Sequence, residues 1–215
     1  DFFTFLANKL ELGIYDSDDL NFKQKPYKKN NGYVSINISD YESFYSNIEE
    51  QILDLLNKLG LINKDSSIID FGCAVGFLLD RLRQQGYKNI CGVEISDWAR
   101  QQCIAKNLRV EKSTPERNFD IMFCLDVFEH IEDKDIISNL HISNPNLVVA
   151  RIPVADKQSE NYYLEISRKD KTHINCKTKL EWKNFFKSLG FKTFLHLNLN
   201  TIYDSTGVFS FICLK

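Results

Sequence analysis

A group of glycine and acidic residues near position 70 has the composition of a ligand-binding turn. The stretch SSIIDFGCAVGFLLDRL, residues 66–82, passes from an apolar segment through Asp70, Gly72 and Gly76 into helix-forming sequence. Glycine weakens ordinary strands and helices, so glycines at such a junction usually serve a tight turn or a close approach of the backbone to a ligand. Glu94 follows the next apolar segment, and a carboxylate at such a strand end is suited to holding the hydroxyls of a ribose. The residues predict a nucleoside-containing cofactor across two adjacent strand ends.

The spacing of these glycines argues against a dinucleotide. A dinucleotide fingerprint has the pattern G-x-G-x-x-G, which gathers backbone amides around a pyrophosphate. Here Gly72 and Gly76 follow the pattern G-x-x-x-G, with Ala74 between them and no basic residue in the turn. A cofactor without phosphates therefore matches better than a nicotinamide dinucleotide.

Alternating strand and helix patterns must position this turn. The apolar segments SIIDFG, NICGVEI, DIMFCLDV and NLVVARIPV alternate with the helical segments FLLDRLRQQG, SDWARQQCIAKN and FEHIEDKDIISNL. Short apolar segments separated by helices indicate a parallel sheet with crossover helices. The units are too few for an eight-stranded barrel, so we expect an open, doubly wound α/β fold.

The two ends of the chain differ from this alternation. Residues 1–40 lack sustained periodicity and predict an irregular arm, whereas YESFYSNIEEQILDLLNKLG has one apolar face at helical spacing and Gly60 as its stop. That face contains Phe44, Ile48, Ile52, Leu55, Leu56 and Leu59. After a helix TKLEWKNFFKSLG, the segments FKTFLHLNLN and GVFSFICLK predict a hairpin. We expect residues 41–215 to form one domain, whose mostly parallel sheet ends in a C-terminal antiparallel strand.

Composition narrows the possible partners. The formal net charge of −2 gives no basic field for nucleic acid, and no apolar stretch approaches the ~20 residues of a membrane helix. None of the six cysteines forms a C-x-x-C pair, so we expect buried free thiols, no metal ligands and a reducing, cytoplasmic compartment.

Three segments resemble the cofactor-site motifs of class I S-adenosylmethionine-dependent methyltransferases, in the usual order. They are IIDFGCAVGFLLDRL, CGVEIS and FDIMFCLDVFEHI. The resemblance covers about residues 45–215, since the final hairpin suits the family. The segment DKTHINCKTKLEWKNFFKSLGF is also similar to a C-terminal segment of members that act on small molecules and sugars. The resemblance implies a Rossmann-like seven-stranded sheet, S-adenosyl-L-methionine as cofactor and methyl transfer as the activity.

The resemblance implies roles for the first motif. Asp70, Gly72 and Gly76 would line the methionine half of the cofactor, and Cys73 would contact it through its backbone. Ala74 departs from the family, which usually has glycine there. That departure is harmless if the residue has a negative φ and costly otherwise.

The other two motifs carry the remaining implied contacts. Glu94 would bind the ribose hydroxyls, and Ile95 would pack on the adenine. Cys124 and Leu125 would offer main-chain carbonyls to the cofactor ammonium. The segment EKSTPERNFD lacks the acidic residue that often reaches the adenine amine, so no residue is assigned to that contact.

Two histidines are candidates for the catalytic base. Transfer to a hydroxyl is helped by a base that takes its proton, and histidine suits that work near neutral pH. His130 lies just past the third motif, although a histidine at a helix start can instead bond to the backbone. His173 lies in a polar loop where members of the family often cover the substrate.

The third motif also bears on the acceptor. Base and amide N-methyltransferases of the superfamily carry an Asn/Asp-Pro-Pro-aromatic sequence where this chain reads CLDV. We therefore expect a small-molecule or sugar/glycan acceptor, methylated on oxygen. The alternatives are a catalytically silent cofactor-binding or structural module, and a protein or nucleic-acid methyltransferase.

Overall fold

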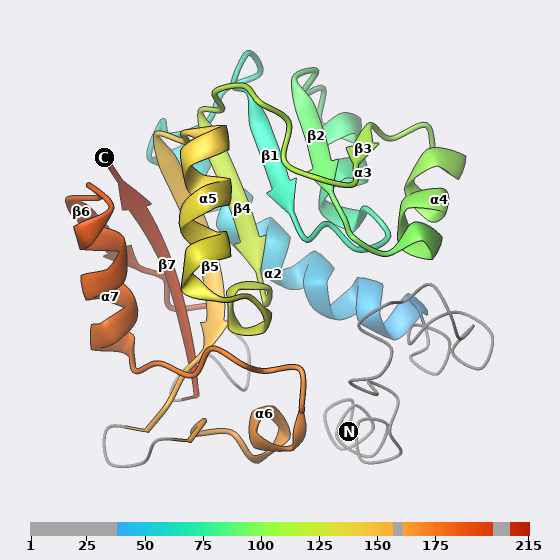
Figure 1. The fold of residues 1–215 in the computed structure, drawn as a ribbon. Helices are drawn as coiled ribbons and strands as arrows, with labels where there is room; N and C mark the ends of the chain where they lie inside the picture. Colours follow the sequence, from blue (N-terminus) through green and yellow to red (C-terminus); the bar gives the residue numbers. More distant parts are fainter. Residues whose placement is uncertain (1–37, 157–160, 200–206) are drawn as a thin grey trace.

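The protein is built on a seven-stranded sheet, seen in a computed structural model that describes residues 38–156, 161–199 and 207–215 (Figure 1). The strand order is β3-β2-β1-β4-β5-β7-β6. In chain order the strands are β1 Ile68–Phe71, β2 Ile90–Val93, β3 Val110–Glu111, β4 Ile121–Leu125, β5 Leu147–Pro153, β6 Thr193–His196 and β7 Val208–Leu214. The expected irregular arm, residues 1–40, lies outside the described residues except for its last three, and for those the prediction is wrong because they begin the helix Ile38–Lys58.

Strand directions confirm the predicted sheet. β1 is parallel to β2 and β4, β2 to β3, and β4 to β5, whereas β7 is antiparallel to both β5 and β6. The C-terminal hairpin and its antiparallel strand are therefore confirmed. No apolar segment predicted β3, because it consists of only two half-buried residues.

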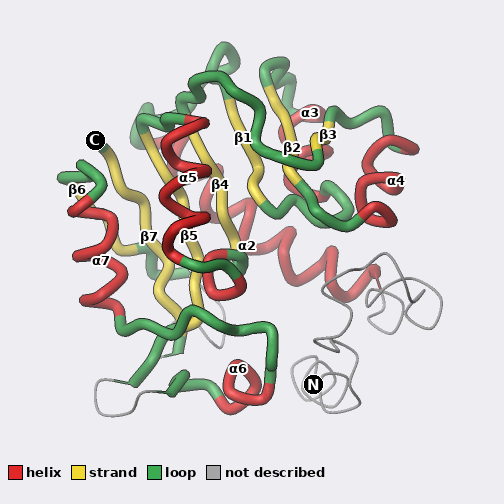
Figure 2. The backbone as a smooth tube through the Cα atoms, viewed as in Figure 1, coloured by secondary structure: helices red, strands yellow, loops and turns green. Residues whose placement is uncertain are grey.

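Helices cover both faces of the sheet (Figures 1 and 2). α2 and α3 lie on one face, and α5 and α7 lie on the other. Their bounds are α2 Ile38–Lys58, α3 Phe77–Gln84, α4 Asp97–Ala105, α5 Asp133–Ser143, α6 Glu165–Lys169 and α7 Lys179–Ser188. The prediction of one helix over FEHIEDKDIISNL is wrong in part, since a short 3₁₀ helix, η2 (Phe128–His130), precedes α5.

Two large apolar clusters form most of the core, one on each face of the sheet, and a smaller third cluster contains Cys73, Leu79, Cys103 and Leu108. Alternate strand residues point to opposite faces, so Val148 packs with α5 and α7 while Val149 packs with α2 and α3. The predicted apolar face of α2 holds except at Leu59, which follows the end of the helix and is half exposed. No helix within the described ranges is long and apolar enough to cross a membrane.

The carboxyl ends of the parallel strands lie together at one edge of the sheet. α6 and the segment that leads to α7 lie beyond that edge (Figures 1 and 2). This is the place where ligands bind in open α/β sheets.

The cysteines are all free, and five of them are buried, as predicted.

Candidate functional site

The turn after β1 has a left-handed backbone at three positions. Gly72, Ala74 and Gly76 have φ angles of 79°, 47° and 82°. The amides of Gly72 and Cys73 both donate to the carbonyl of Val93, at 2.8 and 3.0 Å. The turn is thereby tied to the end of β2. We call Asp70–Gly76 together with Glu94 the glycine junction.

The two glycines are required by protein contacts as well as by their φ angles. A Cβ atom on Gly72 would lie 2.4 Å from Cγ2 of Val127, which immediately precedes η2. A Cβ atom on Gly76 would lie 2.7 Å from Cδ1 of Leu108. Any larger residue at either position must therefore displace a packed side chain, and the expected tight turn is present.

Cys73 and Ala74 differ from the pattern that the motif predicts. The amide of Cys73 donates to Val93 and its carbonyl accepts from Gly76 at 2.8 Å, so only a second lone pair of that carbonyl remains for a ligand. Ala74 has a positive φ, which is the energetically costly alternative for a residue other than glycine. The left-handed region places its Cβ atom too close to the following carbonyl. The backbone contact of Cys73 with the cofactor stays a prediction.

Glu94 closes the junction from the end of β2. Its side chain is buried, and its two oxygens accept from the amides of Ala74 at 3.0 Å and Ser96 at 2.7 Å. Burial raises the pKa of Glu94, while backbone hydrogen bonds from Ser96, Ala74 and Ile95 and the nearby Arg100 act in the opposite direction. A carboxylate has about four acceptor positions, so these bonds leave capacity to accept from a ligand hydroxyl.

Asp70 is a buried acid that has no cationic partner. It is 5% exposed, and no hydrogen bond or ion pair reaches its carboxylate from the described residues. Burial raises its pKa well above the usual range, and the charge of the nearby Glu49 adds to the shift. A buried carboxylate is stabilised by a paired cation, so a ligand ammonium fits this position.

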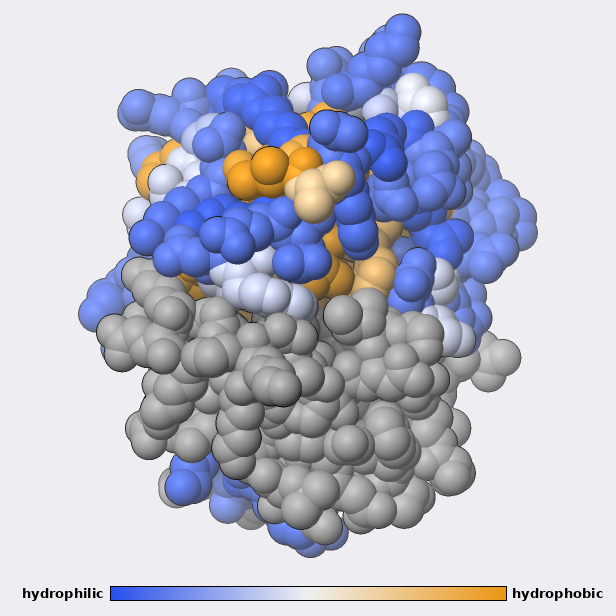
Figure 3. Space-filling view, turned by 90° about the vertical axis from the view of Figure 1, so that its right-hand side faces the viewer, coloured by the Kyte–Doolittle hydropathy of each residue, from blue (hydrophilic) through white to orange (hydrophobic). Residues whose placement is uncertain are grey.

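The other predicted cofactor residues lie at the same edge. Ile95 is the second residue after β2 and is 59% exposed, so its apolar surface is accessible to a flat ring. On the side of the molecule that carries α4, apolar side chains interrupt the hydrophilic surface (Figure 3). Cys124 is buried and Leu125 half buried at the end of β4. The roles of these three residues stay predictions.

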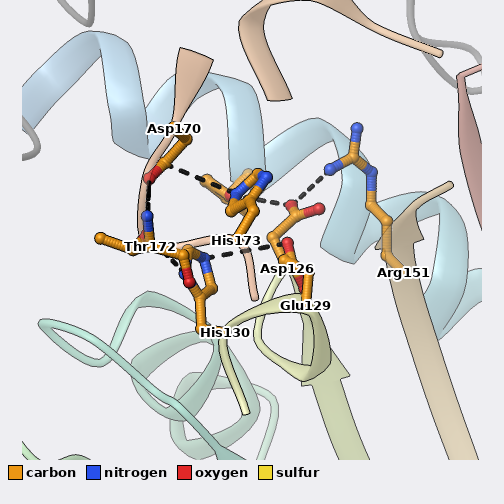
Figure 4. Close-up of polar contacts among 8 residues, drawn as sticks. Asp126, Glu129, His130, Arg151, Asp170, Thr172 and His173 are labelled. Carbon is orange, nitrogen blue, oxygen red and sulfur yellow. Dashed lines mark hydrogen bonds and ion pairs between the residues drawn. The ribbon is translucent and has the colours of Figure 1, made fainter. Parts of the chain in front are cut away.

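A second group of polar side chains assembles beside η2 (Figure 4). Glu129 and His130 come from η2, and Asp170, Thr172 and His173 come from the loop after α6. We call these five residues the histidine cluster. The amides of Ile174 and Asn175 both donate to the carbonyl of Glu129 at 2.9 Å, which docks the loop against η2.

Both candidate bases belong to this cluster, and their rings lie 4.6 Å apart between centroids. Nδ1 of His130 is 2.7 Å from Oγ1 of Thr172 and 3.3 Å from the Thr172 carbonyl. The Thr172 hydroxyl also lies 2.6 Å from Oδ1 of Asp170, whose Oδ2 is 3.5 Å from Nε2 of His173. The backbone contact expected of a structural His130 is thus present, but it comes from the distant loop.

Burial favours the uncharged forms of Glu129, His130 and His173. Burial lowers the pKa of His173 to about 4, and the neighbouring His130 adds to the shift. Burial also lowers the pKa of His130 and raises that of Glu129 well above its usual range. Both imidazoles are therefore neutral near pH 7, with unprotonated nitrogens available.

A charged pair beside the cluster was not predicted. Arg151 of β5 contacts Asp126, which follows β4 at a φ of 56° (Figure 4). The Tyr45 hydroxyl donates to the same carboxylate at 2.9 Å. Asp126 thereby links η2 to α2. The sequence did contain a sign of this contact. An arginine lies inside the apolar segment NLVVARIPV, and a buried charge needs a charged or polar partner.

A sequence model of the family described as a methyltransferase domain matches residues 44–196. No curated protein matches the chain in sequence. Among solved structures, an S-adenosylmethionine-dependent methyltransferase from Archaeoglobus fulgidus is 16% identical, with a TM-score of 0.56 over 78% of this chain and 94% of that one.

Two further solved structures have the same fold. Magnesium protoporphyrin IX methyltransferase from Synechocystis PCC 6803, with bound S-adenosylmethionine, is 14% identical, with a TM-score of 0.58 over 100% of this chain and 97% of that one. Human N-acetylserotonin methyltransferase, in complex with S-adenosylmethionine, is 15% identical, with a TM-score of 0.60 over 88% of this chain and 57% of that one.

Proposed function

The chain belongs to the family of class I S-adenosylmethionine-dependent methyltransferases, and from this premise we propose that it methylates a small-molecule or sugar/glycan acceptor on oxygen. Bound at the glycine junction, S-adenosyl-L-methionine supplies an activated methyl group. The proposal has two parts: the residues that hold the cofactor and the residues that receive the acceptor.

The observation that carries the cofactor assignment is the pair of buried carboxylates at adjacent strand ends. Asp70 is paired with Gly92 in the register of β1 and β2, and Glu94 follows the end of β2. Asp70 has no cationic partner in the described residues, and the Glu94 carboxylate has acceptor capacity beyond its hydrogen bonds to the backbone. Asp70 would thus hold the ammonium side, and Glu94 the ribose hydroxyls. We propose Ile95 as the adenine surface.

The methionine half would follow the backbone between β1 and β4. Gly72 and Gly76 would allow the left-handed turn against which this half lies, and Cys73 would contribute its carbonyl. We propose that the carbonyls of Cys124 and Leu125, at the carboxyl end of β4, also receive the ammonium.

The acceptor would lie against the histidine cluster. η2 begins three residues after β4 ends, so His130 is close in the chain to the proposed ammonium contacts. His173 reaches the same place from the loop beyond the sheet edge (Figure 4). Their neutral imidazoles are the groups that could take a proton from an acceptor hydroxyl. We propose His173 as the base and His130 as the second candidate.

Charge and thiol chemistry support the choice of acceptor and compartment. A net charge of −2 supplies no electrostatic capture of a nucleic acid. The six free cysteines favour a reducing compartment, so a cytoplasmic location is part of the proposal.

Two measurements test this function. Calorimetric titration with S-adenosylmethionine should show one site per chain. The absence of binding would leave only a silent module with the fold. A mass-spectrometric screen of candidate acceptors, sugar nucleotides and glycans included, should then find one that gains a methyl group. Transfer to a nucleic acid or a protein, and not to small acceptors, would overturn the acceptor assignment.

A further inference from the structure

Three side chains of the histidine cluster place potential metal ligands within 4.8 Å of one another. They are Glu129 and His130 of η2 and His173 of the docked loop. Nε2 of His130 lies 3.9 Å from Oε1 of Glu129. We propose that these three residues bind a divalent metal ion beside the glycine junction. Its use toward an acceptor rests on the proposed function, whereas the binding does not.

Unpartnered polar atoms support this site. Oε2 of Glu129 and Nδ1 of His173 are buried and have no hydrogen-bond partner among the described residues. Glu129 itself is 1% exposed. A buried polar atom without a partner costs free energy, and native structures seldom retain one without a role. A single cation would satisfy both atoms and the free nitrogen of His130.

The two imidazoles are oriented as metal-binding histidines usually are. A metal-bound histidine typically gives its other ring nitrogen to a carboxylate, carbonyl or hydroxyl, which fixes its orientation. Here Nδ1 of His130 faces the Thr172 hydroxyl, and Nε2 of His173 faces the Asp170 carboxylate. Asp170 also accepts from the Thr172 hydroxyl at 2.6 Å, so one carboxylate supports both rings.

The donor set indicates the class of ion. Two imidazoles and one carboxylate suit Zn²⁺, Fe²⁺ or Co²⁺, whereas Mg²⁺ and Ca²⁺ prefer oxygen ligands. Ligand atoms at about 2.1 Å from a tetrahedral ion lie about 3.4 Å apart. Binding therefore requires the three side chains to close by about an ångström, which rotation about their side-chain bonds can supply.

Three protein ligands leave coordination positions open. An oxygen of the acceptor could occupy one of them, and a bound ion lowers the pKa of such a hydroxyl. In that state the two histidines are ligands, and the ion takes over the activation of the hydroxyl. The proposal departs from the expectation that the chain lacks metal ligands. That expectation rested on the spacing of the cysteines, none of which takes part.

The test is a titration of tag-free, chelator-treated protein with Co²⁺, followed by visible absorption and calorimetry. We expect one ion per chain in the wild type and at least a 10-fold loss of affinity in Glu129→Gln and in His173→Gln. Glutamine preserves the volume of Glu129 but cannot become a carboxylate ligand. The control is His141→Ala, which removes an exposed histidine of α5 and should bind Co²⁺ as the wild type does.

Titration of the same proteins with S-adenosylmethionine separates this proposal from the proposed function. Retained cofactor affinity in Glu129→Gln, together with lost Co²⁺ binding, supports the metal site and shows that the variant is folded. If the wild type bound Co²⁺ but not the cofactor, the metal site would be supported and the proposed function would be contradicted. Absent Co²⁺ binding, or equal binding by the wild type and both glutamine variants, would overturn the metal site.

Discussion

The glycine junction and the histidine cluster lie at the same edge of the sheet, but different forces hold them in place. The turn of the junction is fixed by main-chain hydrogen bonds to β2. In the cluster, His130 and Thr172 are 42 positions apart and meet through side chains and two loop amides. The proposed cofactor site is therefore built into the sheet itself, whereas the proposed acceptor side depends on a docked loop.

The two regions also differ in what their buried groups lack. The junction contains an acid, Asp70, with no cationic partner among the described residues. The cluster contains two acids, Glu129 and Asp170, and two neutral imidazoles, with unpartnered atoms on Glu129 and His173. The first arrangement suits a ligand that carries its own positive charge. The second suits a ligand that supplies a proton or a metal ion.

The largest effect should separate the two regions by function. His173→Ala should lower turnover by about 10²–10⁴-fold, the range for loss of a general base, and should leave the affinity for S-adenosylmethionine intact. Single-turnover kinetics with the acceptor found by the screen would measure the loss. His141→Ala is the control. Full turnover in His173→Ala would make His130 the candidate for the general base. Full turnover in variants of both histidines would mean that alignment of the acceptor with the cofactor is sufficient for the reaction.

Gly72→Val should damage the junction instead. Valine in the left-handed region costs about 1–2 kcal/mol, and its Cβ atom would meet Val127 at 2.4 Å. We expect cofactor binding to fall below detection, by about 100-fold or more. Gly86→Val is the matched control, since Gly86 has a φ of 88° but nothing within 4 Å of its added Cβ. Wild-type affinity in Gly72→Val would place the cofactor elsewhere.

Glu94→Gln should weaken cofactor binding by about 1–3 kcal/mol, the scale for hydrogen bonds to a charged group. Glutamine retains one acceptor for the amides of Ala74 and Ser96, so it disturbs the fold less than alanine would. Calorimetric titration measures the change, with Glu111→Gln on β3 as the control. Unchanged affinity in Glu94→Gln and Glu94→Ala would remove the ribose assignment.

The pH dependence of stability should report the histidine cluster. The pKa of His173 is lowered to about 4 in the folded chain, so below about pH 6.5 the unfolded chain binds a proton that the folded chain does not. Stability should therefore fall as the pH falls from 7 to 5, by about 1–2 kcal/mol more in the wild type than in His173→Gln.

Urea unfolding of both proteins, free of metal, would measure this difference. The buried acids Asp70 and Glu129, whose pKa values are raised, are present in both proteins and largely cancel in the comparison. Parallel pH profiles for the two proteins would show that His173 titrates normally.

Ala74→Gly should produce the smallest change. Glycine removes the cost of a left-handed alanine, so we expect the free energy of unfolding to rise by about 1 kcal/mol. Ala105→Gly, at the end of α4, should lower it by roughly 0.5–1 kcal/mol. A loss of stability in Ala74→Gly would show that the turn carries no strain at this position.

Much of the fold could be predicted because its signals are local. Apolar periodicity and glycine stops identified α2, β1, β2, β4 and β5, and the hairpin pattern identified the antiparallel β7. The strand β3 and the break between η2 and α5 escaped, because two-residue pairing and a single 3₁₀ turn leave no periodic pattern. Leu59 was wrongly assigned to the apolar face of α2, because it continues the spacing of that face beyond the last residue of the helix.

The candidate site likewise has a part with local sequence signals and a part without them. By itself, the sequence determined the glycine junction, because Asp70, Gly72, Gly76 and Glu94 follow strand ends, and parallel strands bring their carboxyl ends to one edge. Only the tertiary structure decided the histidine cluster and the contact of Arg151 with Asp126. Those contacts join segments far apart in the chain through packing and loop docking. Glu129 in η2 and His173 in a polar loop carry no local sign of the contact between them.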